Sequence, residues 1–136
     1  MEDLKGNSVL ITGGLGFTGS NLARRMLDEG ADVTLLDRVR EEKLPVVDGI
    51  SDEVDIVDGD VRDEELIQEQ VPSADIVYHL AAKSSRPAAN ENPQKNLNIN
   101  CGGPLNVLEA ATSCDTPPRV VYSSTLATVG NVSKTD

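Results

Sequence analysis

The chain contains 136 residues, of which 23 are acidic and 12 are basic, and its net charge is −11 at pH 7. This acidity argues against nucleic acid or an anionic membrane as a general partner. Apolar residues make up 38% of the chain, with only two tyrosines and one phenylalanine, so the core of a single domain must be built from Val, Leu, Ile and Ala.

A glycine-rich turn follows the first expected strand. Residues 9–11 form a short apolar run that predicts a buried strand, and a helix is expected from Asn21. Between them lie Gly13, Gly16 and Gly19. A strand, a glycine turn and a helix in this order predict a diphosphate site, because backbone N–H groups can approach the anion without a Cβ in the way. The alternative is a tight turn between packed elements.

A second strand is expected over residues 31–37, and it ends on an acid. Asp37 lies 24 residues after Gly13, about the spacing at which dinucleotide-binding folds place the carboxylate for the adenosine ribose. Such a carboxylate accepts hydrogen bonds from both ribose hydroxyls and repels a 2′-phosphate, which favours NAD over NADP. The neighbouring Arg38 can serve a 2′-phosphate, and a solvated acid at a strand end is the simpler alternative for Asp37.

The next part of the chain predicts two more strands with a short helix between them. Residues 38–53 are charged and are expected to form a loop, and residues 54–58 form the third strand. Asp63 is expected to cap a helix over residues 64–71. Residues 75–82 contain the fourth strand and its exit.

Asn92 and Pro93 predict the start of another helix. Pro104 removes an N–H inside that helix, so a kink or a break is expected there. A fifth strand is expected over residues 119–124. His79, at the end of the fourth strand, is expected to be a packed, hydrogen-bonded side chain rather than a general base. The alternation of strands and helices predicts an α/β fold, with a doubly wound parallel sheet in the order 3-2-1-4-5.

Residues 12–20, Thr-Gly-Gly-Leu-Gly-Phe-Thr-Gly-Ser, resemble the opening of the extended short-chain dehydrogenase/reductase family, which includes NAD-dependent nucleotide-sugar epimerases and dehydratases. The resemblance implies that residues 1–136 form a Rossmann-type NAD-binding domain. The domain is expected to be incomplete, because the family's sixth strand and C-terminal substrate domain would lie beyond it. The implied diphosphate-binding residues are Gly13, Gly16, Phe17, Thr18 and Gly19.

Further motifs extend the resemblance along the chain. Asp60 and Val61 match a pair that contacts the adenine, with the carboxylate on the exocyclic amine and the valine along the ring. Residues 79–82 match the family's His-Leu-Ala-Ala turn, which passes beside the diphosphate and the nicotinamide ribose. Asn100 matches an asparagine that contacts the cofactor. The implied cofactor-binding residues beyond the glycine turn are Asp37, Arg38, Asp60, Val61, Leu80, Ala81, Ala82 and Asn100.

Residues 123–130 resemble the family's Ser-Ser-Ser-Ala-x-Val-Tyr-Gly, which places Thr125 at the catalytic Ser or Thr. Its hydroxyl would hydrogen-bond the reacting sugar oxygen, and a threonine that caps a turn is the alternative. The pair Leu126-Ala127 stands where 4,6-dehydratases of the family carry Asp-Glu, which disfavours that reaction. The family's Tyr-x-x-x-Lys motif is absent, since neither Tyr78 nor Tyr122 has a lysine four residues later.

The resemblance implies a parent enzyme similar to UDP-glucose 4-epimerase, which oxidises a sugar hydroxyl with bound NAD and then re-reduces the product. Its substrate would be a nucleotide sugar or another small hydroxyl-bearing compound, and the parent is expected to be a homodimer. A hydroxysteroid dehydrogenase or another reductase of the family is an alternative. So is a non-catalytic nucleotide-binding module, because the acid/base motif is missing from the chain.

A cytoplasmic location is expected from three features of the sequence. No apolar run approaches membrane-spanning length, and no signal peptide precedes the first expected strand. Cys101 and Cys114 have neither zinc nor redox spacing, and we expect them to be buried thiols in a reducing compartment.

Overall fold

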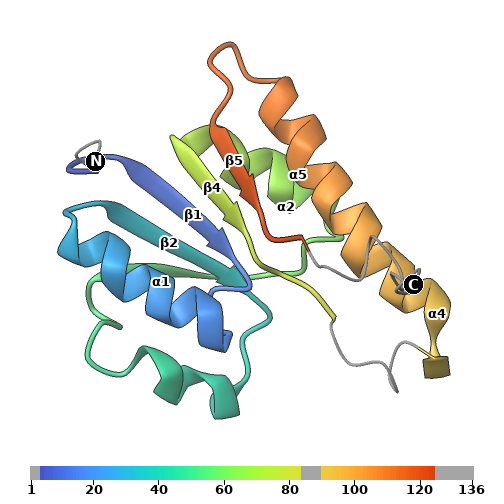
Figure 1. Cartoon of the computed structure of the whole chain (residues 1–136), viewed down its shortest axis with the longest axis horizontal. Coiled ribbons are helices and arrows are strands. Elements are labelled where there is room, and N and C mark those ends of the chain that lie inside the picture. Colours follow the sequence, from blue (N-terminus) through green and yellow to red (C-terminus); the bar gives the residue numbers. More distant parts are fainter. Residues whose placement is uncertain (1–3, 84–89, 125–136) are drawn as a thin grey trace, which may run out of the picture.

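The computed structural model describes residues 4–83 and 90–124. Within these residues, five strands form one parallel sheet in the order β3-β2-β1-β4-β5 (Figure 1). The predicted fold class and strand order are confirmed. The strands are β1 (Ser8–Thr12), β2 (Asp32–Asp37), β3 (Val54–Asp58), β4 (Ile76–His79) and β5 (Arg119–Tyr122).

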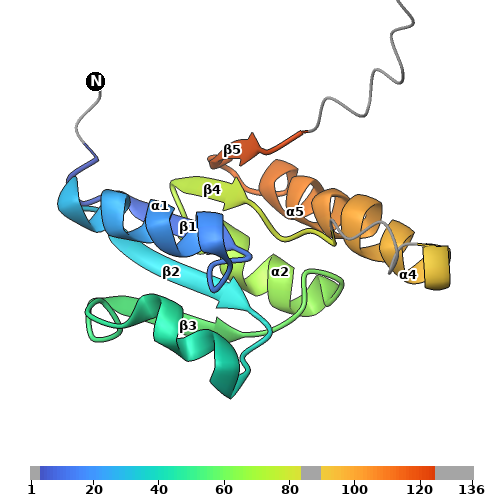
Figure 2. The same ribbon diagram turned by 60° about the horizontal axis from the view of Figure 1, so that its bottom comes forward.

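Helices cover both faces of the sheet (Figures 1 and 2). One face carries α1 (Phe17–Asp28), with the 3-10 helix η1 (Glu41–Val47) beside it. The other face carries α2 (Glu64–Gln70) and α5 (Gly103–Thr112), which contact each other. The 3-10 turn η2 (Val71–Ser73) follows α2, and α4 (Pro93–Leu97) with the π turn η3 (Asn98–Gly102) precedes α5.

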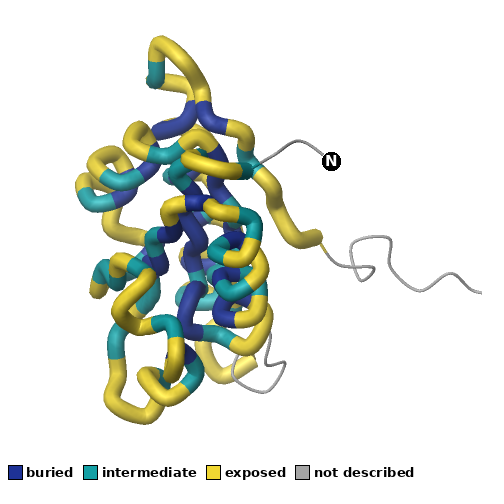
Figure 3. Tube along the Cα trace, turned by 90° about the vertical axis from the view of Figure 1, so that its left-hand side faces the viewer, coloured by how far each residue is buried: buried dark blue, intermediate teal, exposed yellow. Residues whose placement is uncertain are grey.

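The central strand β1 contributes to two separate cores. Val9 and Ile11 pack in the core that includes α1, whereas Leu10 packs in the core that includes α2 and α5. The buried trace accordingly runs through the middle of the molecule, between exposed outer segments (Figure 3). A parallel strand covered on both faces reads as a continuous apolar run, which explains the uninterrupted apolar sequence of β1.

Two differences from the sequence prediction concern helices. Helix α1 begins at Phe17, four residues before the expected Asn21, because Gly16 is extended at φ −86° and ψ 169° and ends the turn there. The segment expected to be loop contains η1, although Pro45 lies inside it. The Arg24 guanidinium anchors η1 to α1 by donating to the carbonyl oxygen of Val46 at 2.8 Å.

Pro104 does not break its helix. The segment from α4 through η3 to α5 runs on without interruption, and the Gly103 N–H donates to the carbonyl oxygen of Asn98, five residues earlier. The expected disturbance therefore takes the form of a π turn, which adds a residue to the helix before the proline. Cys101 in this turn is exposed and Cys114 is half-buried, so the expectation of two buried thiols is wrong.

The predicted cap at Asp63 and the predicted helix start at Asn92 and Pro93 are confirmed. The Asp63 carboxylate accepts from the Leu66 N–H at 3.2 Å, and the Asn92 side chain accepts from the Lys95 N–H at 2.9 Å. Among the described residues, no helix has the length and apolar character needed to cross a membrane.

Candidate functional site

The carboxyl ends of β1, β2, β3 and β4 open into a cavity of about 440 Å³. The cavity lies where the strand order reverses between β1 and β4, which is where doubly wound sheets bind their ligands. Nine of the residues predicted from the sequence line it. The lining residues are Gly13, Gly16, Leu36, Asp37, Arg38, Arg40, Lys43, Gly59, Asp60, Val61, Leu80, Ala81, Ala82, Lys83, Lys95 and Ile99.

The glycine turn packs directly against the exit of β4. Gly13 has a φ of +71°, and a Cβ at this position would lie 2.8 Å from the backbone nitrogen of Ala81. The Gly13 N–H donates to the carbonyl oxygen of Leu36 at 2.8 Å, which joins the turn to β2. Only a glycine fits here, because both the backbone conformation and the space exclude a side chain.

The N-terminus of α1 faces this turn. Its N-cap, Gly16, lines the cavity and provides no side-chain cap, so the N–H groups of the first helical turn have no acceptor within the helix. Phe17, at 86% exposure, and Thr18 are exposed and do not line the cavity, and Gly19 is buried beneath the turn. The arrangement offers backbone donors to an anion at a helix N-terminus.

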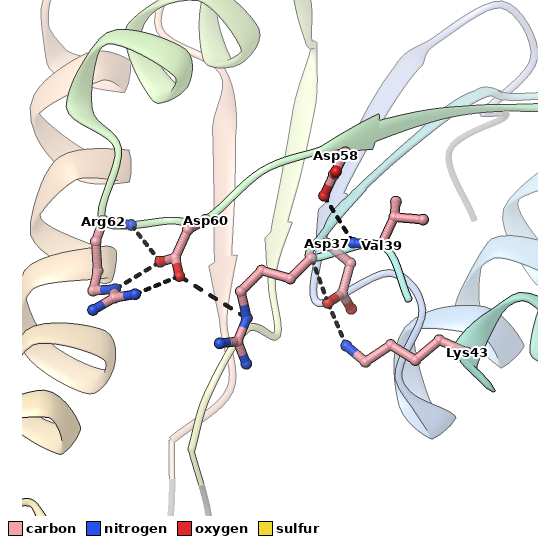
Figure 4. Close-up of polar contacts among 7 residues, drawn as sticks. Asp37, Val39, Lys43, Asp58, Asp60 and Arg62 are labelled. Atoms are coloured by element: carbon pink, nitrogen blue, oxygen red, sulfur yellow. Dashed lines mark hydrogen bonds and ion pairs between the residues drawn. The ribbon is translucent and has the colours of Figure 1, made fainter. Parts of the chain in front are cut away.

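Asp37 ends β2, and its side chain accepts hydrogen bonds from three parts of the chain, of which Figure 4 shows the contact with Lys43. One carboxylate oxygen, Oδ2, accepts from the Leu15 N–H in the glycine turn at 3.1 Å. The other, Oδ1, accepts from the Arg38 N–H at 2.8 Å and from the Lys43 ammonium at 2.5 Å. Both Arg38 and Lys43 line the cavity with Asp37.

Asp60 follows β3 and is paired with arginines. The Arg62 guanidinium donates to both of its carboxylate oxygens, at 2.9 and 2.7 Å, and Arg38 Nε lies 3.9 Å from Oδ2 (Figure 4). The hydrogen bond from Arg62 lowers the pKa of Asp60 from 3.8 to about 2. The carboxylate predicted to meet the adenine amine is therefore ionised at neutral pH, with Arg62 as its present partner. The adjacent Val61 is buried and also lines the cavity.

The exit of β4 is fixed by Thr12 at the end of β1. The Leu80 N–H donates to the Thr12 carbonyl oxygen at 3.1 Å, and the Ala81 N–H donates to the Thr12 hydroxyl oxygen at 3.3 Å. Leu80, Ala81 and Ala82 thereby line the cavity beside the glycine turn.

His79 is a packed residue, as predicted. It is 2% exposed, its Nδ1 lies 2.9 Å from the Thr12 hydroxyl oxygen, and its ring stacks on Tyr122 with centroids 5.8 Å apart. Burial lowers the pKa of His79 from 6.5 to about 4, so the ring is neutral at pH 7. His79 does not line the cavity.

Asn100 lies beside the cavity rather than in its wall. Its Oδ1 accepts from the Lys83 N–H at 2.8 Å, and its Nδ2 donates to the Lys83 carbonyl oxygen at 3.0 Å. These two bonds hold Lys83, which lines the cavity. Thr125, the predicted catalytic residue, and the pair Leu126-Ala127 lie outside the described residues.

Sequence analysis missed several residues of the cavity wall. Arg40 and Lys43 follow β2 in the segment expected to be loop, and Lys95 and Ile99 follow β4. One feature of the sequence could have indicated these cations as part of the cavity wall. Three basic residues follow Asp37 within six positions, namely Arg38, Arg40 and Lys43. A 3-10 helix is needed to return Lys43 to Asp37, and its sequence contains a proline that suggests a loop.

Comparison with known proteins matches nearly the whole chain. The sequence model described as the NAD dependent epimerase/dehydratase family matches residues 9–136. A CDP-paratose 2-epimerase from Salmonella typhi is 33% identical over 91% of this chain and 38% of its own length. A dTDP-glucose 4,6-dehydratase from Mycobacterium tuberculosis is 38% identical over 75% of this chain and 32% of its own length.

A solved structure gives the same result in three dimensions. The UDP-glucose 4-epimerase from Brucella ovis in complex with NAD superimposes with a TM-score of 0.79 at 29% identity, over 96% of this chain and 39% of that one. The chain thus spans less than half the length of each of these proteins. On the family match over residues 9–136, the chain belongs to the NAD-dependent epimerase/dehydratase family.

Proposed function

We propose that this chain is the NAD-binding portion of a nucleotide-sugar epimerase of the UDP-glucose 4-epimerase type. The observation that carries the proposal is the glycine turn after β1, which packs on the β4 exit and lines a cavity together with Asp37, whose carboxylate accepts from the Leu15 N–H of the turn. Residues 1–136 would form a Rossmann domain whose substrate domain lies elsewhere in the parent protein.

The residues around the cavity fit a dinucleotide. The positive φ of Gly13 and the missing Cβ at Gly16 allow the backbone to approach a diphosphate, and the uncapped N-terminus of α1 supplies donors and partial positive charge. Asp37 would accept from the adenosine ribose, with Arg38 beside it. Asp60 and Val61 would border the adenine, and residues 80–82 would border the diphosphate and the nicotinamide ribose.

NAD, when bound, supplies the acceptor for a hydride from a substrate carbon. The described residues would bind and orient it, and Thr125 would orient the reacting hydroxyl. The family's acid/base tyrosine and its lysine partner would come from the remainder of the parent, which we infer to be a homodimeric cytoplasmic enzyme. The relatives named above carry CDP-, dTDP- and UDP-sugars in their names, which supports a nucleotide sugar as the substrate.

Two alternatives keep some support. A hydroxysteroid dehydrogenase or another reductase of the family would use the same cavity, and its substrate pocket would differ only in the missing domain. A non-catalytic nucleotide-binding module would explain the absence of Tyr-x-x-x-Lys in the sequence. A reading frame that continues beyond Asp136 into that motif would decide for an enzyme.

We expect the purified protein to bind NAD more tightly than NADP, and the Asp37→Asn variant to lose most of this preference. Removing the charge removes the repulsion of a 2′-phosphate and weakens the hydrogen bonds to the ribose, and charge-assisted bonds of this kind contribute about 1.5–3 kcal/mol. The preference should therefore fall roughly tenfold or more. Isothermal titration calorimetry with both dinucleotides measures it.

The matched control is Asp58→Asn. Asp58 ends the neighbouring strand β3, and its carboxylate accepts from the Val39 N–H at 2.8 Å without lining the cavity (Figure 4). That variant should keep the unaltered preference. Equal affinity of the unaltered protein for NAD and NADP would show that the interpretation of Asp37 is wrong.

We also expect the chain of 136 residues to convert no sugar nucleotide, although it binds NAD. A threonine hydroxyl can orient a substrate but is not usefully deprotonated near neutral pH without an adjacent base. The assay is incubation with NAD and UDP-glucose or UDP-galactose, followed by separation of the two sugars. Epimerisation above the level of a Thr125→Ala control would contradict the expectation and would mean that another residue here replaces the tyrosine.

A further inference from the structure

The carboxylate of Asp37 is shared among three donors, and Lys43 is the only charged one among them. The Asp37 and Lys43 side chains are 10% and 31% exposed, so the ion pair is partly shielded from water. Figure 4 shows Lys43 reaching back from η1 to the end of β2. Both residues line the cavity, so the pair forms part of the wall at its β2 end.

This pairing limits what Asp37 can accept from a ribose. A carboxylate has about four lone-pair positions. The N–H groups of Leu15 and Arg38 use two of them and the Lys43 ammonium uses a third. Two vicinal hydroxyls need two acceptor positions, so with Lys43 in place the carboxylate can receive only one of them.

The pairing also changes the charge that a ligand meets. Arg38 lies 3.9 Å from Asp60, and Arg40 lies 3.8 Å from Glu42, so each of these arginines already has its own acidic neighbour. Among residues 4–83 and 90–124, Lys43 is the cation whose ion pair with Asp37 neutralises this carboxylate by direct contact. A phosphate ester on the ribose would therefore meet an ammonium beside the carboxylate instead of an isolated negative charge.

We infer that Lys43 is a specificity-determining residue, which lowers the preference for NAD by neutralising Asp37 and by offering its ammonium to a 2′-phosphate. This inference rests on the proposed function, because it assumes that a dinucleotide occupies the cavity. Asp37 produces a preference for NAD over NADP, and Lys43 makes this preference smaller. The site therefore retains measurable affinity for NADP.

The test is calorimetric titration of NAD and NADP into the unaltered protein and the variants Lys43→Met and Lys43→Gln. Each variant removes the ammonium, and Lys43→Met also frees one acceptor position on Asp37, since methionine has no side-chain donor. We expect NADP to bind about tenfold more weakly, whereas NAD binds as well as before or more tightly. Lys43→Arg keeps the charge and should keep the preference of the unaltered protein.

The control is Lys95→Met. This substitution removes the same charge from the same cavity. Lys95, however, lies on α4, beyond β4, whereas Lys43 follows β2. Its loss should change the affinities for NAD and NADP by the same factor. Titration of adenosine 2′,5′-bisphosphate and adenosine 5′-monophosphate tests the adenosine end alone. Here too, only Lys43→Met and Lys43→Gln should change the ratio of the two affinities.

The outcomes separate the two proposals. If both dinucleotides bind, and the ratio of the NAD affinity to the NADP affinity is the same in the unaltered protein, Lys43→Met and Lys43→Gln, the inference about Lys43 is overturned. The proposed function then still stands. If neither dinucleotide binds to the folded, unaltered protein, the proposed function fails and the inference fails with it. A ratio that moves equally in Lys43→Met and Lys95→Met would show a general charge effect and would also overturn the inference.

Discussion

Replacement of Gly19 by alanine is expected to destabilise the protein by about 3 kcal/mol and to abolish measurable NAD binding. A Cβ at this position would lie 2.8 Å from Gly14 Cα and closer still to the carbonyl oxygen of Gly13. Both atoms belong to the backbone of the glycine turn, so relief requires the turn itself to move. Urea unfolding followed by circular dichroism gives the stability, and calorimetry gives the affinity.

Gly102→Ala is the matched control for this substitution. Gly102 also lies in a helical segment, at φ −65° and ψ −44°, but a Cβ there would meet no atom within 4 Å. Alanine should therefore stabilise this position by about 0.5–1 kcal/mol, through its better helix propensity. The two substitutions are therefore expected to change the free energy of unfolding in opposite directions. A Gly19→Ala protein that is as stable as Gly102→Ala would rule out the tight packing of α1 against the turn.

Acidification from pH 7 to pH 4.5 is expected to remove roughly 2.4 kcal/mol of stability through His79. The pKa of this ring is about 4 in the folded protein because the ring is buried, and 6.5 is its ordinary value. Between these values the unfolded chain binds a proton that the folded protein does not bind. The contribution of His79 is therefore fully present above pH 6.5 and is lost as the pH falls toward 4.

The variant His79→Gln isolates this contribution, because glutamine can hydrogen-bond to Thr12 but does not titrate. Its own stability will be lower, so the quantity to compare is the change in unfolding free energy between pH 7 and pH 4.5. Asp60 does not interfere, since its contribution is lost only as the pH falls from 3.8 through about 2. Equal pH dependence in the variant and the unaltered protein would contradict the role of His79.

The sheet could be predicted from the sequence because its signals are local. Each strand is a short segment rich in aliphatic residues, and the helices between strands favour parallel, right-handed crossovers with few possible orders. The start of α1 was missed because Gly16, Phe17, Thr18 and Gly19 include poor helix formers. Close packing on the turn outweighs their propensity. Cys101 was misplaced because its burial was inferred from cysteine spacing alone, which carries no information about the face of the helical segment on which it lies.

The candidate site was predictable in its backbone and less so in its side-chain partners. Gly13, Gly16 and Asp37 follow from strand ends and spacing, and all three line the cavity. The ion pair of Asp37 with Lys43 depends on η1, which Arg24 holds against α1. No periodicity in the sequence expresses such a tertiary anchor, and the same holds for the two bonds from Asn100 to Lys83.

Because β1 is buried on both faces, its apolar side chains do not by themselves fix the register of this strand against its neighbours. Val9, Leu10 and Ile11 are all aliphatic, so a slip by one residue would exchange the two cores without exposing an apolar side chain to water. Thr12 removes this ambiguity, because its hydroxyl contacts both His79 and the Ala81 N–H in one alignment only. The Thr12 hydroxyl therefore acts together with the Gly13 N–H, which donates to the Leu36 carbonyl oxygen, to set the position of the glycine turn and the shape of the cavity.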